Sequence, residues 1–457
     1  MNKRYYYFST PNIMPIVCSV FLLCVSAGCV GSNVHKAENT ASVSIDPIYE
    51  IKQSNSELIA NAPDVAQIKF KKISRSLFSF YRGTSPLFYR YCRSHGVSDA
   101  LVSGATEKIQ LHGDYHIENC GAYKSEDGLV SFDLMDFDDT FKGPYILDIR
   151  RAAVSLRIVC EQKGWETKAD EVVSHFVSSY SDTIGGIESQ SISVDFSYKK
   201  GTSVALIREI IDGVENITRK SFFSKTGFTR INESGKRIFI KSKTLLEVPQ
   251  YVHIEKAMSE YIRTLDKNAR KESTFYAIKD VVLDRKSGIG SAGKMKYLIL
   301  IEGVSMSPDD DVILEMKQED SPEWAGEYGD SYTNNGKRVY NGQSEMQSLS
   351  YPCIGYTTIQ NKNYFVSEFT PFYAELETKE INSYQDILSI AEVTATLIAK
   401  GHVRASQNRK TIMKDILKVS ESGNLKKDIM NFSKKCFFFF ESSYDKFKKR
   451  LKEYPLL

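Results

Sequence analysis

The segment HGDYHIENCG, which begins at His112, gathers residue types that can bind a metal ion or move a proton. His112, Asp114 and His116 alternate along the chain. That spacing puts three ligands on one face only in a regular strand, which Gly113 opposes. A loop is therefore favoured, with Asp114 and Asn119 five residues apart. In phosphoryl transfer an aspartate accepts the proton of the attacking hydroxyl, and an asparagine soon after it helps to hold magnesium. The segment predicts that chemistry, with His116 as a further catalytic candidate.

A second acidic segment, DLMDFDDTFKGPYILD, follows a strand-like run. Magnesium prefers carboxylate oxygens and retained waters, so an aspartate at the end of a strand is a suitable partner for Asn119. We assign Asp136 as the metal ligand, with Asp133 as its competitor and Asp138 as an assisting ligand. A solvated acidic turn is the alternative interpretation.

A glycine-rich turn, GIGSAG, lies between two strand-like runs later in the chain. It contains Gly288, Gly290, Ser291 and Gly293. Small residues let backbone N–H groups approach phosphates. A strand follows the turn, whereas a dinucleotide-binding fold needs a helix there. Lys317, in the run VILEMKQE, is the candidate phosphate contact. An ordinary hairpin and an exposed lysine are the alternatives.

Two further segments would complete a nucleotide site. The run NGQSEMQ offers a helix glutamate, Glu345, that would steer Lys317, with Gln343 and Gln347 as alternatives. The run YFVSEFTP, which contains Glu368, resembles the strand whose backbone faces adenine in kinases.

The elements that must position these residues change in type along the chain. Periodic apolar residues predict helices from residue 63 onward, and again over 144–162, 166–215, 253–270 and 383–406. Alternating residues and turns predict strands within 276–372. The chain is divided into a polar tether (29–62), a helical part with the catalytic loop (63–275), a β-rich part (276–372) and returning helices (373–457).

The first segment closely resembles the HGDxHxxN loop of aminoglycoside and choline phosphotransferases, and the second resembles their metal-binding run. This resemblance implies an α+β, protein-kinase-like fold with two lobes. It also implies ATP and Mg²⁺ as cofactors and an unknown hydroxyl-bearing acceptor, with acceptor contacts expected within 165–270. Kinases place the glycine-rich turn before the catalytic loop, and here the order is reversed. The resemblance therefore implies a circular permutation in which residues 383–406 pack beside residues 108–119.

Over residues 65–405 the chain is similar to an uncharacterised bacterial family, domain of unknown function 2252. The shared segments are FSFYRG, GDYHIENCG, FDLMDFDDTFKGPYILDIRR, GIGSAG, MKQE and NGQSEMQ. Cys120, Met135 and Asp139 depart from the family pattern, as do the two residues after Lys317. None of these departures removes a proposed catalytic group, and the resemblance supports a fold more than a substrate.

The N-terminus has the layout of a bacterial export signal. Basic residues precede an apolar run that is short for a spanning helix and that ends in SAGC. This ending resembles a lipobox, although Ser26 stands where leucine is usual. Residues 1–28 would then be a signal peptide and Cys29 the acylated N-terminus of an exported, membrane-anchored lipoprotein. An uncleaved anchor is the alternative.

Composition limits the function classes. A length of 457 residues exceeds one ordinary core, and a net charge of +3 gives no argument for a nucleic-acid partner. Two classes compete: an enzyme that transfers a phosphoryl or nucleotidyl group, and an exported kinase-like binding lipoprotein without turnover. The acidic set favours the enzyme, because clustered carboxylates are costly without a cation. The export signal favours the binding protein, because ATP is scarce outside the cytoplasm.

Overall fold

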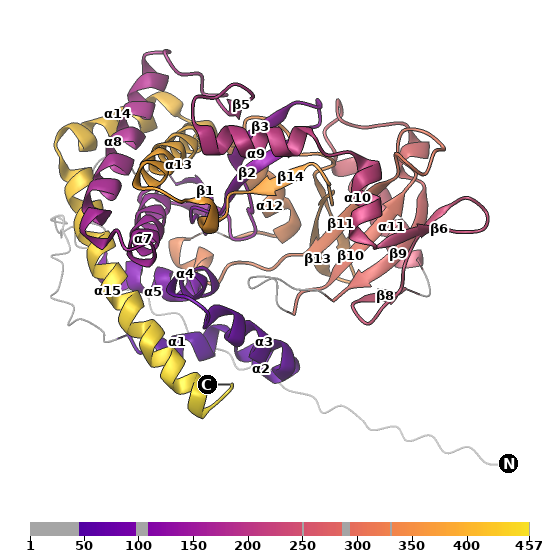
Figure 1. Cartoon of the computed structure of the whole chain (residues 1–457), viewed down its shortest axis with the longest axis horizontal. Coiled ribbons are helices and arrows are strands. Elements are labelled where there is room, and N and C mark those ends of the chain that lie inside the picture. Colours follow the sequence, from indigo (N-terminus) through magenta and orange to yellow (C-terminus); the bar gives the residue numbers. More distant parts are fainter. Residues whose placement is uncertain (1–44, 97–107, 249–250, 286–292, 330, 457) are drawn as a thin grey trace, which may run out of the picture. The chain divides into compact units, whose positions relative to one another are not determined.

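A computed structural model describes residues 45–96, 108–248, 251–285, 293–329 and 331–456. About half of these residues are helical, and their strands form several antiparallel sheets (Figure 1). The expected α+β class is therefore confirmed. No helix in these ranges is both long and apolar enough to cross a membrane. The acylation site expected at Cys29 and three residues of the glycine-rich turn, Gly288, Gly290 and Ser291, lie outside the described residues.

The largest sheet in the described ranges has six strands in the order β12-β13-β11-β10-β9-β8. Strands β9 and β10 flank the glycine-rich turn, β11 carries Lys317, and helix α12 connects β11 to β12. The strands expected within 276–372 are thereby confirmed. The bounds are β8 (Leu245–Glu247), β9 (Ile278–Asp284), β10 (Lys296–Ile301), β11 (Val312–Gln318), α12 (Asn335–Met346), β12 (Gly355–Ile359) and β13 (Lys362–Glu368).

Both faces of this sheet are covered, which explains the continuous apolar run in β10. Ile299 and Ile301 belong to the core that contains α11 (Val252–Thr264). Leu298 and Leu300 belong to a separate core with Phe223 of α10 (Arg219–Thr226). Strands buried on both faces read as unbroken apolar runs. Packing on both faces therefore fixes the position of the strand that carries Lys317.

A smaller sheet and a strand pair carry the predicted catalytic segments. Strands β2 (Cys120–Lys124) and β3 (Val130–Leu134) form a hairpin, flanked by β14 (Tyr373–Glu375) and β5 (Tyr198–Lys199). Strand β1 (Ile109–Leu111) pairs with β4 (Phe141–Gly143). The catalytic loop thus runs from β1 to β2, and the acidic segment runs from β3 to β4. Each loop connects the β1–β4 pair to the β2–β3 pair. The two loops therefore lie close together.

Helices α7, α8, α13, α14 and α15 lie together on one side of strands β1 to β3 (Figure 1). Helices α7 and α13 pack against α8, and α15 packs along α7. Tyr115 Oη donates to Thr394 Oγ1 at 3.2 Å, so residues 383–406 lie beside residues 108–119 as expected. The bounds are α7 (Ile146–Gln162), α8 (Ala169–Glu188), α9 (Ala205–Glu215), β6 (Thr229–Ile231), β7 (Arg237–Phe239), α13 (Tyr384–Ala405), α14 (Arg409–Glu421) and α15 (Asn424–Glu453).

The segment expected to be a tether is helical in its second half. Helices α1 (Pro47–Ser54) and α2 (Ser56–Asn61) precede α3 (Pro63–Ile73), α4 (Leu77–Gly83) and α5 (Ser85–His95). The Asp46 side chain caps α1 by accepting from Ile48 N at 3.0 Å, and Ile51 is buried. An N-cap followed by proline is a helix-start signal, which the polar composition of this stretch concealed.

Candidate functional site

Asp148, in the first turn of α7, anchors the predicted catalytic loop. Its carboxylate accepts from His112 N at 2.7 Å and from Gly113 N at 3.0 Å, and His402 Nε2 lies 3.2 Å away. Burial alone would raise the pKa of Asp148, but the hydrogen bonds and the nearby imidazoles lower it overall. Gly113 has a φ of 88°, and a Cβ there would lie 1.9 Å from Asp139 O. The glycine therefore allows the loop to approach the acidic segment.

Arg151, one turn further along α7, fixes the proposed base. Its Nε lies 2.7 Å from Asp114 Oδ1, and its Nη2 contacts the same oxygen. Arg151 is fully buried, whereas 17% of the Asp114 side chain stays exposed. Arg151 thus holds the Asp114 carboxylate from the protein interior, and part of the carboxylate stays accessible to solvent. Asn119 Nδ2 donates to Asp114 O at 2.9 Å. With its nitrogen used internally, Asn119 keeps Oδ1 for a cation, and oxygen is the ligand that magnesium takes.

The acidic segment reaches the large sheet through Lys317. The Lys317 ammonium pairs with Asp138 and lies 3.9 Å from Glu319 Oε1. Asp136 has a φ of 59°, an uncommon conformation for a residue with a side chain. Such conformations cluster at functional sites. The charge of Asp114 acts on Asp136 as well, so the loop, the acidic segment and the sheet meet at one place.

Most carboxylates at this meeting point are poorly compensated. Burial, and then the charge of Asp138, raise the pKa of Asp136 to about 7 and that of Glu319 to about 8. Burial and a second carboxylate raise the pKa of Asp139 to about 6. Asp136 is nevertheless exposed, so solvent screens its charge more than that of Glu319, which is 1% exposed. Burial also opposes ionisation of Asp138, yet Lys317 outweighs it and lowers its pKa to about 2. Lys294 Nζ lies 3.3 Å from Glu319 Oε2, so two lysines face the four carboxylates of Asp136, Asp138, Asp139 and Glu319. The pKa values of three of the four stay raised despite these lysines.

A metal ion would need ligands from outside the protein to complete its shell. In the described part of the chain, no group of three or more His, Cys, Asp or Glu side chains is placed to hold a metal ion. This also means that His112, Asp114 and His116 do not form the alternative metal site. Magnesium usually takes one or two carboxylates together with phosphate oxygens and waters. Asp136 and Asn119 fit that smaller set, because they provide one carboxylate and one amide oxygen.

Asp133, the competing metal ligand, is fully engaged inside the protein. It is 0% exposed, and Lys400 Nζ of α13 lies 2.6 Å from its Oδ2. Ser348 N donates to the same oxygen at 3.0 Å, and Leu134 N donates to Oδ1 at 2.8 Å. These contacts favour Asp136 over Asp133 as a metal ligand.

Three other expected site residues have partners other than Lys317. The charge that acts on Glu345 is that of Lys142, and Glu319 takes the place beside Lys317 that Glu345 was expected to fill. Glu368, at the end of β13, pairs with Arg219 of α10 at 2.6 Å. His116 is buried with its ring edge-on to a phenylalanine, and burial holds its pKa well below the ordinary value.

A cavity of about 510 Å³ opens beside Asp114. Its walls come from helices α1 to α5, from Gly293 and Lys294 after the glycine-rich turn, and from residues 318–324. Gly293 has a φ of 86°, and a Cβ there would lie 2.7 Å from Leu58 Cδ1 of α2. No residue that lines it comes from 165–270, where acceptor contacts were expected.

Sequence reasoning missed several residues that hold this site. Arg151 and Lys400 each place a buried cation against an aspartate, and Glu319 crowds Lys317. The signal for Arg151 was present, because DIRR puts arginines inside an apolar helix where a buried charge needs a partner. Lys400 gave a similar signal within TLIAKGHV, but its partner lies 267 residues away.

A protein-family model described as "Uncharacterized protein conserved in bacteria (DUF2252)" matches residues 61–450. The match extends beyond the expected similarity on both sides and includes nearly all of α15. No curated protein and no solved structure matches the chain.

Proposed function

We propose that this chain, which belongs to the bacterial family DUF2252, is an ATP- and Mg²⁺-dependent phosphotransferase with a protein-kinase-like fold. The observation that carries the proposal is the meeting of Asp114, Asn119, Asp136 and Lys317. They come from two loops and a separate sheet, and Asp138 joins the two parts by pairing with Lys317. A set of this composition is what phosphoryl transfer requires.

The order of elements in the large sheet supports the kinase-like fold. A strand, a glycine-rich turn, a second strand and a third strand with a lysine follow one another, and a helix comes next. Protein kinases use the same succession for their phosphate lid, lysine and steering helix. The packing of α13 beside the catalytic loop supports the permutation, because it restores a neighbour that the chain order separates. The departure is the helix glutamate, whose place is taken by Glu319.

Each residue then has a defined role. Asp114, fixed by Arg151, orients the acceptor hydroxyl and accepts its proton. Asn119 and Asp136 would hold Mg²⁺, which supplies positive charge to the phosphates. Lys317 would contact the phosphates, giving up part of its pairing with Asp138. Phosphoryl transfer passes through a loose transition state. The rate therefore depends more on the positioning of the reactants and on charge stabilisation than on the basicity of Asp114.

The cavity beside Asp114 is the proposed entrance for the acceptor. It contains the base itself, and the N-terminal helices form one of its walls. Lys69 of α3 lies at this wall and donates to Asn55 Oδ1 at 2.8 Å, and burial lowers its pKa to about 8. Acceptor contacts are therefore proposed for residues 54–86 instead of 165–270.

Titration of the chain from residue 30 onward with ATP, with and without Mg²⁺, tests the function. We expect Mg²⁺-dependent binding that is lost in Asp136→Ala and retained in the matched control Glu345→Gln. Formation of ADP together with a phosphorylated acceptor, tested over a panel of hydroxyl compounds, would support phosphoryl transfer. Formation of pyrophosphate together with a nucleotidylated acceptor would indicate nucleotidyl transfer through nearly the same residues. Binding without turnover would favour the kinase-like binding protein. Absence of nucleotide binding would contradict the proposal.

We also propose attachment to the membrane through an acylated Cys29, with the folded part exported. Cys29→Ser should move the protein into the soluble exported fraction. Unchanged membrane attachment would indicate an uncleaved N-terminal anchor.

A further inference from the structure

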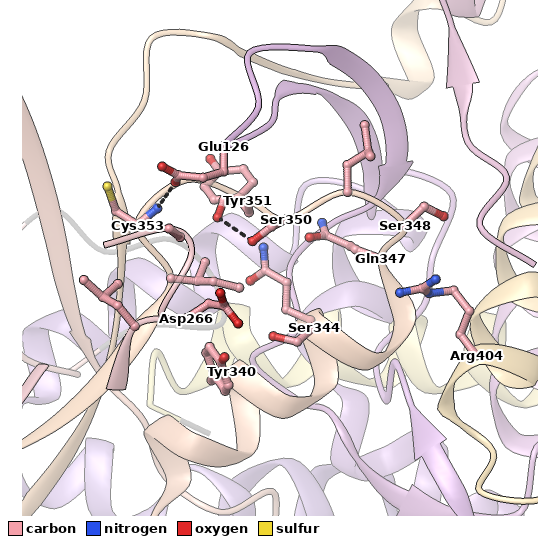
Figure 2. A pocket seen from close by; sticks show the side chains of 15 residues that line it. Glu126, Asp266, Tyr340, Ser344, Gln347, Ser348, Ser350, Tyr351, Cys353 and Arg404 are labelled. Carbon is pink, nitrogen blue, oxygen red and sulfur yellow. Dashed lines mark hydrogen bonds between the residues drawn. The ribbon is translucent and has the colours of Figure 1, made fainter. Parts of the chain in front are cut away.

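A second cavity, of about 260 Å³, lies along α12 and the segment that follows it. Its walls come from α12, from the turn between β2 and β3, from residues 265–269 and from α13 (Figure 2). None of its lining residues has a role in the proposed transfer reaction. Cavities for drug-sized ligands measure about 300–1,000 Å³. This cavity therefore suits a smaller molecule.

Two buried polar atoms at this cavity have no hydrogen-bond partner among the described residues. Gln347 is 3% exposed, and its Oε1 accepts nothing, although its Nε2 donates to Leu134 O at 2.6 Å. Arg404 pairs with the exposed Asp195 through Nη1, and its Nε is likewise without an acceptor. Unsatisfied buried polar groups cost free energy. A ligand that donates to Gln347 and accepts from Arg404 would remove that cost.

Opposite charges stand at opposite sides of the cavity. Figure 2 shows Glu126 and Asp266 on one side and Arg404 on the other, with Gln347 between them. Glu126 is paired with Lys271 at 2.8 Å, whereas Asp266 forms no ion pair within the described chain. A small zwitterion fits this arrangement, with its ammonium group toward Asp266 and its carboxylate toward Arg404. The backbone part of a free amino acid has this form.

The residues at this cavity also hold the strand that leads to Asp136. Gln347 bonds the end of β3 at Leu134, and Ser348 N donates to Asp133 Oδ2. Both residues line the cavity. Asp136, the proposed metal ligand, follows Leu134 by two residues. A ligand that orders Gln347 and Ser348 would therefore also affect the position of Asp136.

We propose that this cavity binds a free amino acid or a similar small zwitterion, and that its occupancy changes nucleotide affinity at the candidate site. Binding at the cavity does not depend on the proposed function. The effect on nucleotide affinity rests on it.

The binding test uses the full chain and each proteinogenic amino acid at millimolar concentration. At least one should raise the Tm by about 2 °C or more, as expected for a ligand well above its Kd. Ser344→Trp, at an exposed position of α12 that lines the cavity, should abolish the rise. Ser259→Trp, at an exposed position of α11 outside the cavity, is the matched control and should keep it. Arg404→Gln is a second cavity variant, with an expected loss of affinity of at least tenfold. The proposal is overturned if no amino acid raises the Tm, or if both cavity variants keep the rise.

The coupling test measures the Kd for Mg²⁺–ATP with and without the bound amino acid. We expect a change of about fivefold or more in the wild type, the low end of usual allosteric coupling, and none in Ser344→Trp. An amino acid that binds without changing nucleotide affinity would overturn the coupling. If no nucleotide binds at all, the proposed function fails, and the Tm result decides alone whether the cavity is a ligand site.

Discussion

Two sets of carboxylates in the described chain have opposite surroundings. Asp133 and Asp148 are 0% exposed, and each has two or more N–H donors and a basic side chain beside it. Asp136, Asp139 and Glu319 have raised pKa values, and burial is the largest cause for each.

This difference distinguishes carboxylates that stabilise the fold from carboxylates that are candidates for binding a ligand. A buried charge is tolerated when it is paired and hydrogen-bonded, and the first set meets that condition. The second set meets it only in part: Lys294 Nζ lies 3.3 Å from Glu319 Oε2, whereas Asp136 and Asp139 form no ion pair among the described residues. Groups with strongly shifted pKa values cluster at functional sites. The contrast supports a cation-binding role for the second set and a structural role for the first.

The largest expected effect comes from breaking the satisfied set. Lys400→Met leaves Asp133 buried without its cation, which should lower the free energy of unfolding by about 3–5 kcal/mol in urea denaturation. Lys69→Met is the control, because Lys69 donates to the neutral Asn55, so its removal leaves no buried carboxylate without its cation. Its expected cost is below about 1 kcal/mol. Equal losses of unfolding free energy in the two variants would contradict the structural role assigned to Asp133 and its pairing with Lys400.

The next effect should appear in nucleotide affinity. Under the proposed function, Lys317→Met would remove a charged contact to the phosphates that is worth about 1.5–3 kcal/mol, so the Kd for Mg²⁺–ATP should rise by about 10- to 100-fold. Lys279→Met is the matched control, since Lys279 lies in the same sheet and pairs with Asp311 at 2.8 Å, away from the site. Affinity would be measured by calorimetry. An unchanged Kd in Lys317→Met would contradict the proposal that the large sheet contributes to the nucleotide site.

The pH dependence of stability should distinguish the two sets. Unfolded Asp and Glu titrate near pH 4. Where the native pKa is raised, the native state holds more protons between about pH 4 and that value, so stability falls as the pH rises through the window. Without Mg²⁺, stability should fall from about pH 5 to 8, by at most about 1.4 kcal/mol per pH unit for each fully buried group. Asp138, with its pKa at about 2, is ionised in both states throughout this window.

Glu319, at 1% exposure and with its pKa at about 8, should dominate this slope, because solvent screens the exposed Asp136. Glu319→Gln should therefore flatten the curve most, and Mg²⁺ with a nucleotide should flatten it in the wild type. A stability that rises from about pH 5 to 8, with the same slope in Glu319→Gln, would contradict the assignment.

The smallest expected effect concerns the helix glutamate. Glu345 is not beside Lys317, so Glu345→Gln should change the Kd for Mg²⁺–ATP by less than about twofold, a difference within about 0.4 kcal/mol. A larger change would show that α12 moves toward Lys317 when the nucleotide binds.

Local patterns in the sequence were sufficient for much of the fold. The alternation around Lys317 and the periodicity of residues 383–406 gave the large sheet and α13, because each pattern reflects which faces are buried. Helices α1 and α2 were missed, since their apolar residues are few and their burial depends on distant contacts. Among these is the ion pair of Glu50 with Arg90 of α5 at 3.0 Å.

The motif residues were likewise found from spacing, but their partners were not. The approach of Lys317 to Asp138 spans 179 positions, and that of Lys400 to Asp133 spans 267. Spacing along the chain carries no information on such pairs. It therefore could not show that Asp133 is already satisfied or that Glu319 replaces Glu345.

Binding of Mn²⁺, a paramagnetic substitute for Mg²⁺, tests the central claim most directly. Electron paramagnetic resonance would count bound Mn²⁺ in the presence of ATP for the wild type, Asp136→Ala and Asn119→Ala, with Glu345→Gln, outside the acidic set, as a comparison that also removes one negative charge. We predict a site that needs ATP and that Asp136→Ala weakens by tenfold or more, with a smaller loss in Asn119→Ala. Equal Mn²⁺ binding in the wild type and Asp136→Ala would contradict the claim that the unsatisfied carboxylates form the cation site.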